Sequence, residues 1–373
     1  MACNPPPTSP SELKALLDTE LAKGLTQSAI LRHWLHQPNS EIPLGSNAAV
    51  SALRNAIIIG LDAEWYEHDA QYITELGLSI LSPQTPQPAS SSPWPLLRTL
   101  QNHYVRIKPH AHLINGDNCS GHPTRFQFGH TSFLSIAAAK TMLESEFSRT
   151  DAQGRLRPII FMGHAVSNDY EVIKSRFGID LQALGSIVAT IDTQVLFSEA
   201  VAGRSPPISL KNLLARYEIV EPYLHNAGND VVCTLVAALL VVFPPARSCS
   251  CAYVEFKAGL RDGAASSRCL YGSVVYCEKC GSEEHLVTDC KVRDWFCGFC
   301  SKDPGCGGYT HNSERCVARV KELAGVGKGK NGGKNGGLVH AVPCQLCIES
   351  TGPERYGMVQ AYGHRTEECW WGK

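Results

Sequence analysis

The sequence lacks several features that would place it in a special class of protein. Its charges nearly cancel, with 34 Lys and Arg against 35 Asp and Glu in 373 residues, which excludes a histone-like or polybasic protein held to nucleic acid by bulk charge. It has no basic-then-apolar signal sequence, and its longest apolar run, 231–243, is too short to span a bilayer. We therefore expect an intracellular protein of the nucleus, the cytoplasm or both, with no membrane partner.

Cysteine is scarce in the first two thirds of the chain and abundant in the last third. Three of the 16 cysteines precede residue 244, and the other thirteen lie from Cys249 to Cys369. Disulfides rarely persist inside cells, so this distribution predicts a second part of the chain that is organised by metal.

The pattern of apolar residues predicts an α/β domain with a mixed sheet, because three strands in a meander are followed by alternating helices and strands. We expect four regions: an N-terminal tail with short helices at 1–50, the α/β domain at 51–246, a linker at 247–272, and a cysteine-rich region at 273–373 that contains a Gly/Lys linker at 325–337. Strands are predicted near 56–65, 72–81, 103–108, 158–163 and 187–192, and the main helices near 11–36, 132–147, 167–178, 209–218 and 228–243.

Two carboxylates end the first predicted strand. Asp62 and Glu64 are two residues apart, so their side chains point to the same face of the strand. Two unit charges about 4 Å apart repel by roughly 4 kcal/mol at an effective dielectric constant of about 20. A cation would remove this repulsion, and oxygen ligands suit Mg²⁺ or Mn²⁺.

Three further polar residues are predicted at or just before the first turn of a helix. Asp169 follows the strand at 158–163, and Ser167 is positioned to cap the helix whose first turn would contain Asp169. His225 and Asp230 flank the turn-forming residues 226–229 just before the apolar final helix. They converge only if His225 lies on the loop and Asp230 in the first helical turn. Asp192, at the end of another strand, is interpreted as structural.

This set of residues resembles the DEDDh 3′–5′ exonuclease family of the ribonuclease H-like superfamily, over about residues 54–244. That family has D-x-E on its first strand, an Asp after a Gly-His or Gly-Asn turn, and H-x-A-x-x-D at its last helix. A closer similarity is to the fungal Gfd2-like proteins and the fungal Argonaute-interacting exonucleases, through ITELGLSIL, SLKNLL and LHNAGND. The resemblance implies a mixed five-stranded sheet flanked by helices.

The resemblance also implies an activity. Asp62, Glu64, Asp169 and Asp230 would hold two Mg²⁺ or Mn²⁺ ions, and His225 would be the general base that takes a proton from water. The expected substrate is single-stranded RNA or DNA, with RNA favoured, and the expected partner is an Argonaute-type or other RNA-processing protein. The alternative is a nuclease fold without catalysis, kept as a binding scaffold in RNA silencing or mRNA export.

The cysteine-rich region contains three sets of zinc ligands. Cys277-x₂-Cys280-x₄-His285-x₄-Cys290 has the spacing of a retroviral-type zinc knuckle, and three thiolates with one imidazole form a closed, structural site. The pattern of a Cys-x₂-Cys pair followed by His-x₄-Cys occurs twice more, and Cys306 competes as a ligand in the first of these repeats. The repeats consist of Cys297, Cys300, His311 and Cys316, and of Cys344, Cys347, His364 and Cys369.

We expect one to three zinc ions and a role in binding nucleic acid or a protein partner. Zinc knuckles bind single strands through aromatic side chains that stack on bases. Tyr276, Trp295, Phe296 and Phe299 lie beside the ligands and are candidates for stacking.

Overall fold

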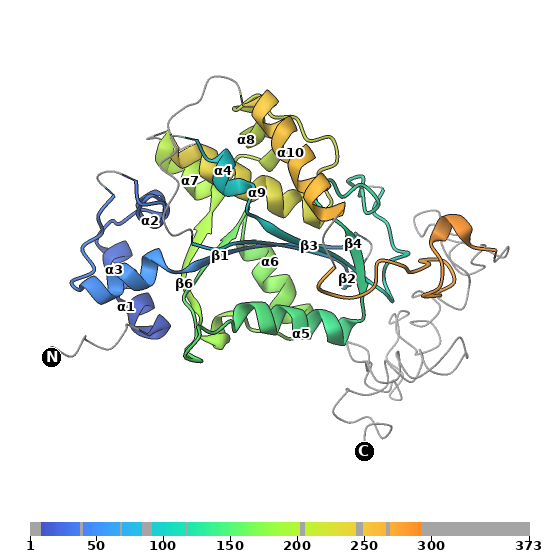
Figure 1. The fold of residues 1–373 in the computed structure, drawn as a ribbon, viewed down its shortest axis with the longest axis horizontal. Helices are drawn as coiled ribbons and strands as arrows, with labels where there is room; N and C mark the ends of the chain where they lie inside the picture. Colours follow the sequence, from blue (N-terminus) through green and yellow to red (C-terminus); the bar gives the residue numbers. More distant parts are fainter. Residues whose placement is uncertain are drawn as a thin grey trace, which may run out of the picture.

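The computed structural model describes residues 9–37, 40–67, 69–83, 92–116, 118–201, 206–243, 249–265 and 269–291. Its centre is a six-stranded mixed sheet with the strand order β4-β3-β2-β1-β5-β6, covered by helices on both faces (Figure 1). The strands are β1 (Ile57–Tyr66), β2 (Asp69–Leu81), β3 (Gln101–Ile107), β4 (Thr131–Leu134), β5 (Ile159–Gly163) and β6 (Ile187–Asp192). The β1–β2 and β2–β3 pairs are antiparallel, and the β1–β5, β5–β6 and β3–β4 pairs are parallel.

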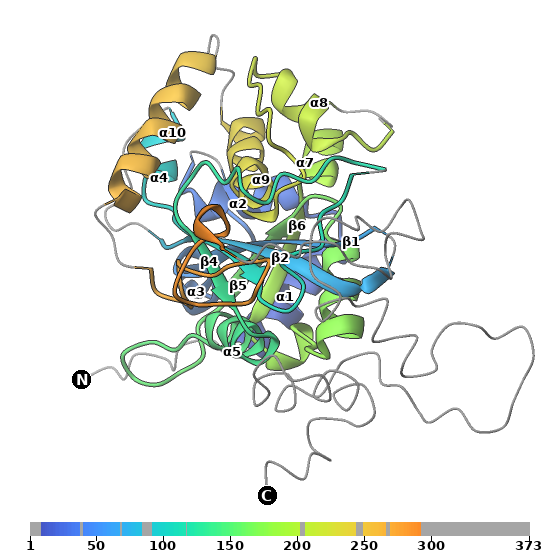
Figure 2. The same cartoon turned by 90° about the vertical axis from the view of Figure 1, so that its right-hand side faces the viewer.

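The two faces of the sheet carry different helices. One face packs against α9 (Ala227–Val242), and the other packs against α5 (Ile136–Phe147) (Figures 1 and 2). The α9 side is completed by α1 (Pro10–Ala22), α2 (Gln27–Trp34), α3 (Asn47–Arg54), α4 (Trp94–Leu97), α7 (Thr193–Ala200), α8 (Leu210–Ala215) and α10 (Ser250–Ala265), and the α5 side by α6 (Ser167–Val172) with the π-helical turn Ile173–Phe177. Two short 3₁₀ turns lie at Gln182–Leu184 and Val287–Asp289.

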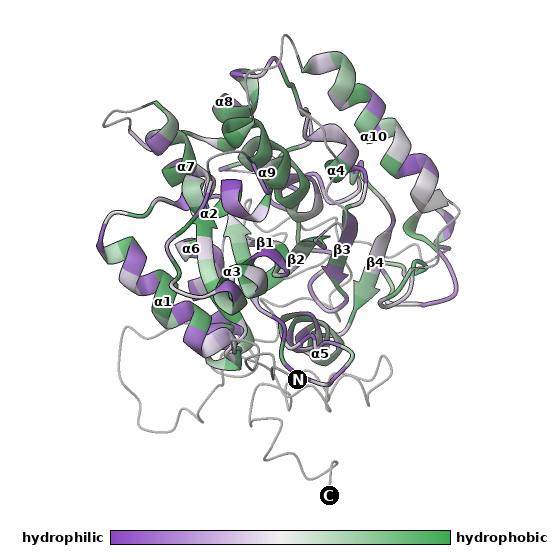
Figure 3. Cartoon of the chain, turned by 60° about the vertical axis from the view of Figure 1, so that its left-hand side comes forward, coloured by the Kyte–Doolittle hydropathy of each residue, from purple (hydrophilic) through white to green (hydrophobic). Residues whose placement is uncertain are grey.

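Helix α9 is the central helix of the core. Every one of its 16 residues is buried, and Figure 3 shows it as a mostly apolar helix. A helix that is hydrophobic all round must be enclosed on all sides, and α9 contacts β1, β2, β3, β5, α7 and α8.

Glycines let α9 approach the sheet closely. A β-carbon at Gly60 would lie 2.4 Å from Cδ1 of Leu235, and one at Gly77 would lie 2.0 Å from the carbonyl oxygen of Ala227. Real β-carbons do not make such contacts. The N-terminal turn of α9 can therefore rest on β2 only because β2 has a glycine there, and this contact fixes where α9 begins relative to the sheet.

The α/β fold with a mixed sheet is confirmed, and the expected number of five strands is wrong. The sixth strand, β4, has four residues and occupies one edge of the sheet, where it pairs only with β3 among the named strands of the described chain. Its short TSFL sequence does not give a period-two pattern long enough to separate it from the following helix.

The structure also differs from the expected linker at 247–272. Helix α10 occupies most of that segment and buries Tyr253 and Phe256 against the core, where they are 3% and 0% exposed. Two aromatic side chains three residues apart lie on the same face of a helix, and their burial makes α10 part of the domain. In the part of the chain that the structure describes, no helix is both long and apolar enough to cross a membrane.

Candidate functional site

The first two carboxylates project from β1 on the face that α9 covers. Asp62 lies opposite Gly77 and Glu64 lies opposite Glu75 in the β1–β2 register, and the pairing becomes irregular directly after Glu64. Both carboxyl-bearing residues are partly exposed, unlike the buried apolar residues before them. The two acids therefore lie near the end of regular β1–β2 pairing, where the residues of the strand become partly exposed.

Asp169 joins this pair from α6. Its Oδ1 accepts a hydrogen bond of 3.0 Å from the backbone N–H of Ala63, the residue between Asp62 and Glu64. Asp169 lies in the first helical turn, as predicted, but Ser167 does not cap the helix. Asp192 instead binds the backbone at the start of this helix. Its carboxylate accepts the N–H groups of Ala165 and of the N-cap residue Val166 at 3.2 and 3.0 Å.

His225 and Asp230 converge at the start of α9. His225 precedes the N-cap Asn226, and Asp230 lies in the first helical turn, as the sequence predicts. The backbone N–H of His225 donates to Oδ2 of Asp230 at 3.0 Å, with His225 in the left-handed region at φ 63°. One ligand atom from each of Glu64, His225 and Asp230 can be chosen so that all three lie within 4.8 Å of one another. The His225 residue is exposed while Asp230 is 9% exposed.

The four carboxyl groups lie close enough to affect one another's pKa values. Burial raises the pKa values of Asp62, Glu64 and Asp230 well above their ordinary range, and repulsion from the neighbouring carboxylates raises them further. Burial also raises the pKa of Asp169, to about 7. The Oδ1 atom of Asp230 is buried and has no hydrogen-bond partner among the described residues. Clustered carboxylates with a free buried oxygen suit a divalent cation, which would satisfy that oxygen and offset the repulsion.

The environment of His225 favours the neutral form of its imidazole by lowering its pKa. Partial burial lowers the pKa of His225, and the nearby His122 and Lys211 lower it further. A neutral imidazole beside the carboxylate cluster can accept a proton.

A fifth acid, Glu75, was not singled out from the sequence. It lies on β2 opposite Glu64, is 5% exposed, and accepts the N–H of Ala227 at 3.2 Å. Burial raises its pKa, and the charge of Arg106 opposes that rise. The available signal was a lone acid within the mostly apolar segment ITELGLSIL, on a strand expected to pair with the D-x-E strand.

The long β3–β4 connection packs beside the cluster. The backbone N–H of His122 donates to the carbonyl of His225 at 3.1 Å, and the Asn226 amide donates to the carbonyl of His122 at 3.0 Å. The carboxylate of Glu67, just after β1, accepts the N–H groups of Gly116 and Asn118 at 2.6 and 2.7 Å. This connection holds the loop that carries His225 against the end of β1.

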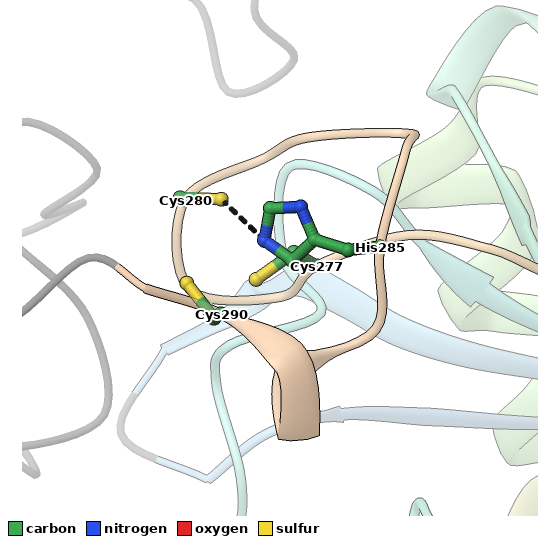
Figure 4. Close-up of side chains that lie close together, drawn as sticks. All are labelled: Cys277, Cys280, His285 and Cys290. Atoms are coloured by element: carbon green, nitrogen blue, oxygen red, sulfur yellow. Dashed lines mark hydrogen bonds between the residues drawn. The ribbon is translucent and has the colours of Figure 1, made fainter.

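The first set of predicted zinc ligands is brought together (Figure 4). One ligand atom from each of Cys277, Cys280, His285 and Cys290 lies within 4.8 Å of the others, with 3.3 Å between Sγ of Cys280 and Nε2 of His285. Burial alone would raise the pKa of the Cys277 thiol, but hydrogen bonds from backbone N–H groups at Cys280 and Lys279 hold it below its ordinary value. Three thiols and one imidazole in this arrangement fit a tetrahedral zinc ion.

Of the other residues predicted to act in the cysteine-rich region, the structure describes only Tyr276. The two repeats of the pattern and the aromatic residues Trp295, Phe296 and Phe299 lie outside the described residues. Tyr276 is described, and it is 6% exposed. Its ring packs at 5.2 Å from that of Phe133, and its hydroxyl donates to the carbonyl of Lys108 at 3.0 Å. The expectation that Tyr276 stacks on a base is wrong, because its ring faces the domain.

One family model matches the segment that contains the four acids and His225. Residues 57–241 match the family model described as DNA polymerase III subunit epsilon-like, C-terminal domain, of the DEDDh type. A solved structure of exonuclease I resembles the chain with a TM-score of 0.33 and 13% identity, covering 51% of this chain and 42% of its own.

Three curated fungal proteins are similar in sequence. An uncharacterized nucleolar protein of Schizosaccharomyces pombe is 26% identical over 60% of this chain and 82% of its own length. The Saccharomyces cerevisiae protein called Good for full DBP5 activity protein 2 is 24% identical over 49% of this chain and 35% of its own. An uncharacterized protein of the same yeast is 22% identical over 49% and 40%. The chain thus spans well under half the length of the two budding yeast relatives. Residues 57–241 of this chain therefore match the DEDDh exonuclease family.

Proposed function

We propose that the protein is a metal-dependent 3′–5′ exonuclease that hydrolyses phosphodiester bonds of single-stranded RNA or DNA, with RNA favoured. The observation that carries the proposal is the buried oxygen of Asp230, which has no partner in the described chain and lies beside Glu64 and His225. A scaffold protein has no physical need for several carboxylates that repel one another at one place.

Four carboxylates and one imidazole would share the chemistry. Asp62, Glu64, Asp169 and Asp230 would hold two Mg²⁺ or Mn²⁺ ions, and such ions would supply charge stabilisation for an in-line displacement on phosphorus. His225 takes the proton of the attacking water, and its exposure lets the imidazole reach that water. The hydrogen bond from the Ala63 N–H holds the Asp169 carboxylate against the segment of β1 that carries Asp62 and Glu64.

The zinc region is proposed to support this activity. The cluster from Cys277 to Cys290 would bind one structural zinc ion, and the two sets of ligands beyond residue 291 would form similar modules that bind substrate or a protein partner. The nucleolar relative favours a nuclear location, and the relative named for DBP5 activity favours a place in RNA metabolism. An RNA-processing partner of the Argonaute type is proposed from family resemblance.

The test is a cleavage assay on 5′-labelled single-stranded RNA and its DNA counterpart, with Mn²⁺, Mg²⁺ or no added divalent ion. We expect a ladder that shortens from the 3′ end and is lost in Asp62→Ala and Asp169→Asn. A matched control is Glu171→Gln, which removes an exposed acid from the same helix as Asp169 and is expected to retain full activity. Binding of intact RNA by the wild type, with no cleavage in either metal, would instead establish the non-catalytic scaffold.

A further inference from the structure

A row of directly paired residues crosses the sheet from the nuclease site toward the zinc cluster. Glu64 on β1 pairs with Glu75 on β2, Glu75 pairs with Arg106 on β3, and Arg106 pairs with Phe133 on β4. Phe133 then forms a bridge with Ser273, four residues before the first zinc ligand. Directly paired residues project from the same face of a sheet, so this row places Glu75 and Arg106 between the two candidate metal sites.

Arg106 is buried between the two regions. It is 1% exposed, and its guanidinium forms a close ion pair with Glu278, the residue after Cys277. The same guanidinium donates to the carbonyl of Ala111 and lies 5.6 Å from the centre of the Phe133 ring. Taking a cation out of water is costly unless it is paired, so the zinc segment supplies one of the charges that allow Arg106 to be buried.

The zinc segment is attached to the domain by further contacts. Tyr276 packs on Phe133, and Lys108, two residues after Arg106, forms a close ion pair with Glu283. The Glu283 side chain is 60% exposed, whereas that of Glu278 is 14% exposed. The segment therefore makes two ion pairs with β3 and its end, one buried beside Glu75 and one near the surface.

We propose that Glu278 and Arg106 are positioning residues that couple zinc binding by the Cys277–Cys290 cluster to the nuclease metal site, with Glu75 as the link between them. The effect of this coupling on catalysis rests on the proposed nuclease function. The test of the coupling measures metal binding and does not require nuclease activity. With Glu278 in place, the Arg106 guanidinium is paired with Glu278 and lies opposite Glu75 in the β2–β3 register. Glu75 then keeps its hydrogen bond to the N–H of Ala227 and adds negative potential beside Glu64.

Loss of zinc reverses this arrangement. A zinc knuckle without its metal does not keep its fold, so Glu278 leaves Arg106, and Arg106 then neutralises Glu75 alone. The departure of Glu278 and the neutralisation of Glu75 lower the negative potential at Glu64 and Asp230. The weaker hydrogen bond from Ala227 to Glu75 also loosens the first turn of α9. Divalent cations are therefore held less tightly in the nuclease site when the zinc cluster is empty.

The test measures Mn²⁺ binding by electron paramagnetic resonance in full-length protein, together with its zinc content and with hydrogen exchange at the Ala227 amide. We expect Glu278→Gln to keep zinc, to weaken Mn²⁺ binding by about 5- to 20-fold, and to speed exchange at Ala227. The matched control Glu283→Gln removes the exposed ion pair of the same segment and is expected to change neither. Equal effects of the two variants, or unchanged Mn²⁺ binding in zinc-loaded Glu278→Gln, would overturn the proposal.

A cycle with Glu75 keeps the test decisive if Glu278→Gln loses zinc. Zinc is removed from the wild type and from Glu75→Gln, the chelator is dialysed away, and Mn²⁺ affinity is measured before and after. Zinc removal should weaken Mn²⁺ binding in the wild type and have little further effect in Glu75→Gln. An equal loss in both proteins would show that the coupling does not pass through Glu75. Neither readout requires cleavage, so failure of the nuclease assay would leave this result interpretable.

Discussion

The carbonyl oxygen of Ala227 rests directly over Gly77, so closely that a β-carbon at Gly77 would lie 2.0 Å away. Gly77 is also the residue that pairs with Asp62 across the β1–β2 ladder. One backbone contact therefore fixes the distance between the acid on β1 and the helix that brings Asp230.

This contact predicts the effect of Gly77→Ala. The added methyl group must push the first turn of α9 from the sheet, which we expect to cost about 1–3 kcal/mol of stability and to weaken Mn²⁺ binding. Chemical denaturation and metal titration measure the two effects. Gly259→Ala on α10 is the control, because a β-carbon there meets no atom within 4 Å, and it should stabilise the protein by roughly 0.5–1 kcal/mol. Unchanged stability in Gly77→Ala would contradict the close approach.

His225→Asn should separate catalysis from folding. Asn tolerates the left-handed backbone at this position better than most residues, and it keeps the N–H that donates to Asp230. We expect kcat to fall by about 10²- to 10⁴-fold, as for loss of a general base, with the melting temperature and Mn²⁺ affinity little changed. Single-turnover cleavage measures the rate. A variant with full activity would remove His225 from the proposed mechanism.

The raised pKa of Asp169, about 7 against an ordinary value of 3.8, predicts a pH dependence of stability. Between these values the folded protein holds a proton that the unfolded chain releases, so the metal-free protein loses stability as the pH rises through that window. In Asp169→Asn this contribution disappears. Thermal unfolding of zinc-loaded protein, without Mn²⁺ and across pH 5 to 8, compares the two proteins at each pH.

Added Mn²⁺ should show the opposite trend. The cation binds the ionised carboxylates and competes with their protons, so its stabilising effect should grow with pH. At about 100 times Kd the stabilisation is about 2.7 kcal/mol. A stabilisation by Mn²⁺ that is the same at pH 5 and pH 8, or that persists in Asp62→Ala, would contradict a site made of these carboxylates.

Zinc removal should affect the domain as well as the cysteine-rich region. Tyr276 and Arg106 are both buried where the zinc segment meets β3 and β4, so Cys280→Ser is expected to expose both and lower the melting temperature of the main transition. Cys251→Ser is the control, because Cys251 is an exposed thiol outside the cluster. A main transition unaffected by Cys280→Ser would show that the segment does not stabilise the domain.

Local sequence signals predicted the parts of the site that depend on neighbouring residues. The turn-forming residues between His225 and Asp230 specify a loop followed by a helix start, and the structure has both. Asp62 and Glu64 share a face because a strand alternates. Asp192 caps the helix that follows it, accepting the N–H of Gln194 at 2.8 Å, as expected for a structural acid.

The features that the sequence did not predict depend on pairing between distant segments. Glu75 belongs to the site only through the register that places it opposite Glu64, and register is a property of two strands. The burial of α10 depends on Phe128 and Trp94, whose rings lie 5.9 and 5.7 Å from that of Phe256. Tyr276 looked available beside its zinc ligand, and only its contact with Phe133 removes it from solvent.

The complete burial of α9 has a consequence for protein synthesis. The strands that α9 covers are made first, since β1 and β2 end at Tyr66 and Leu81, but their apolar face stays open until residue 242 has left the ribosome. A chain that stops before Ala227 lacks both His225's partner Asp230 and the cover for that face. Truncated translation products should therefore be aggregation-prone and unable to assemble the acidic cluster, which can form only after residue 242 of the 373 has been made.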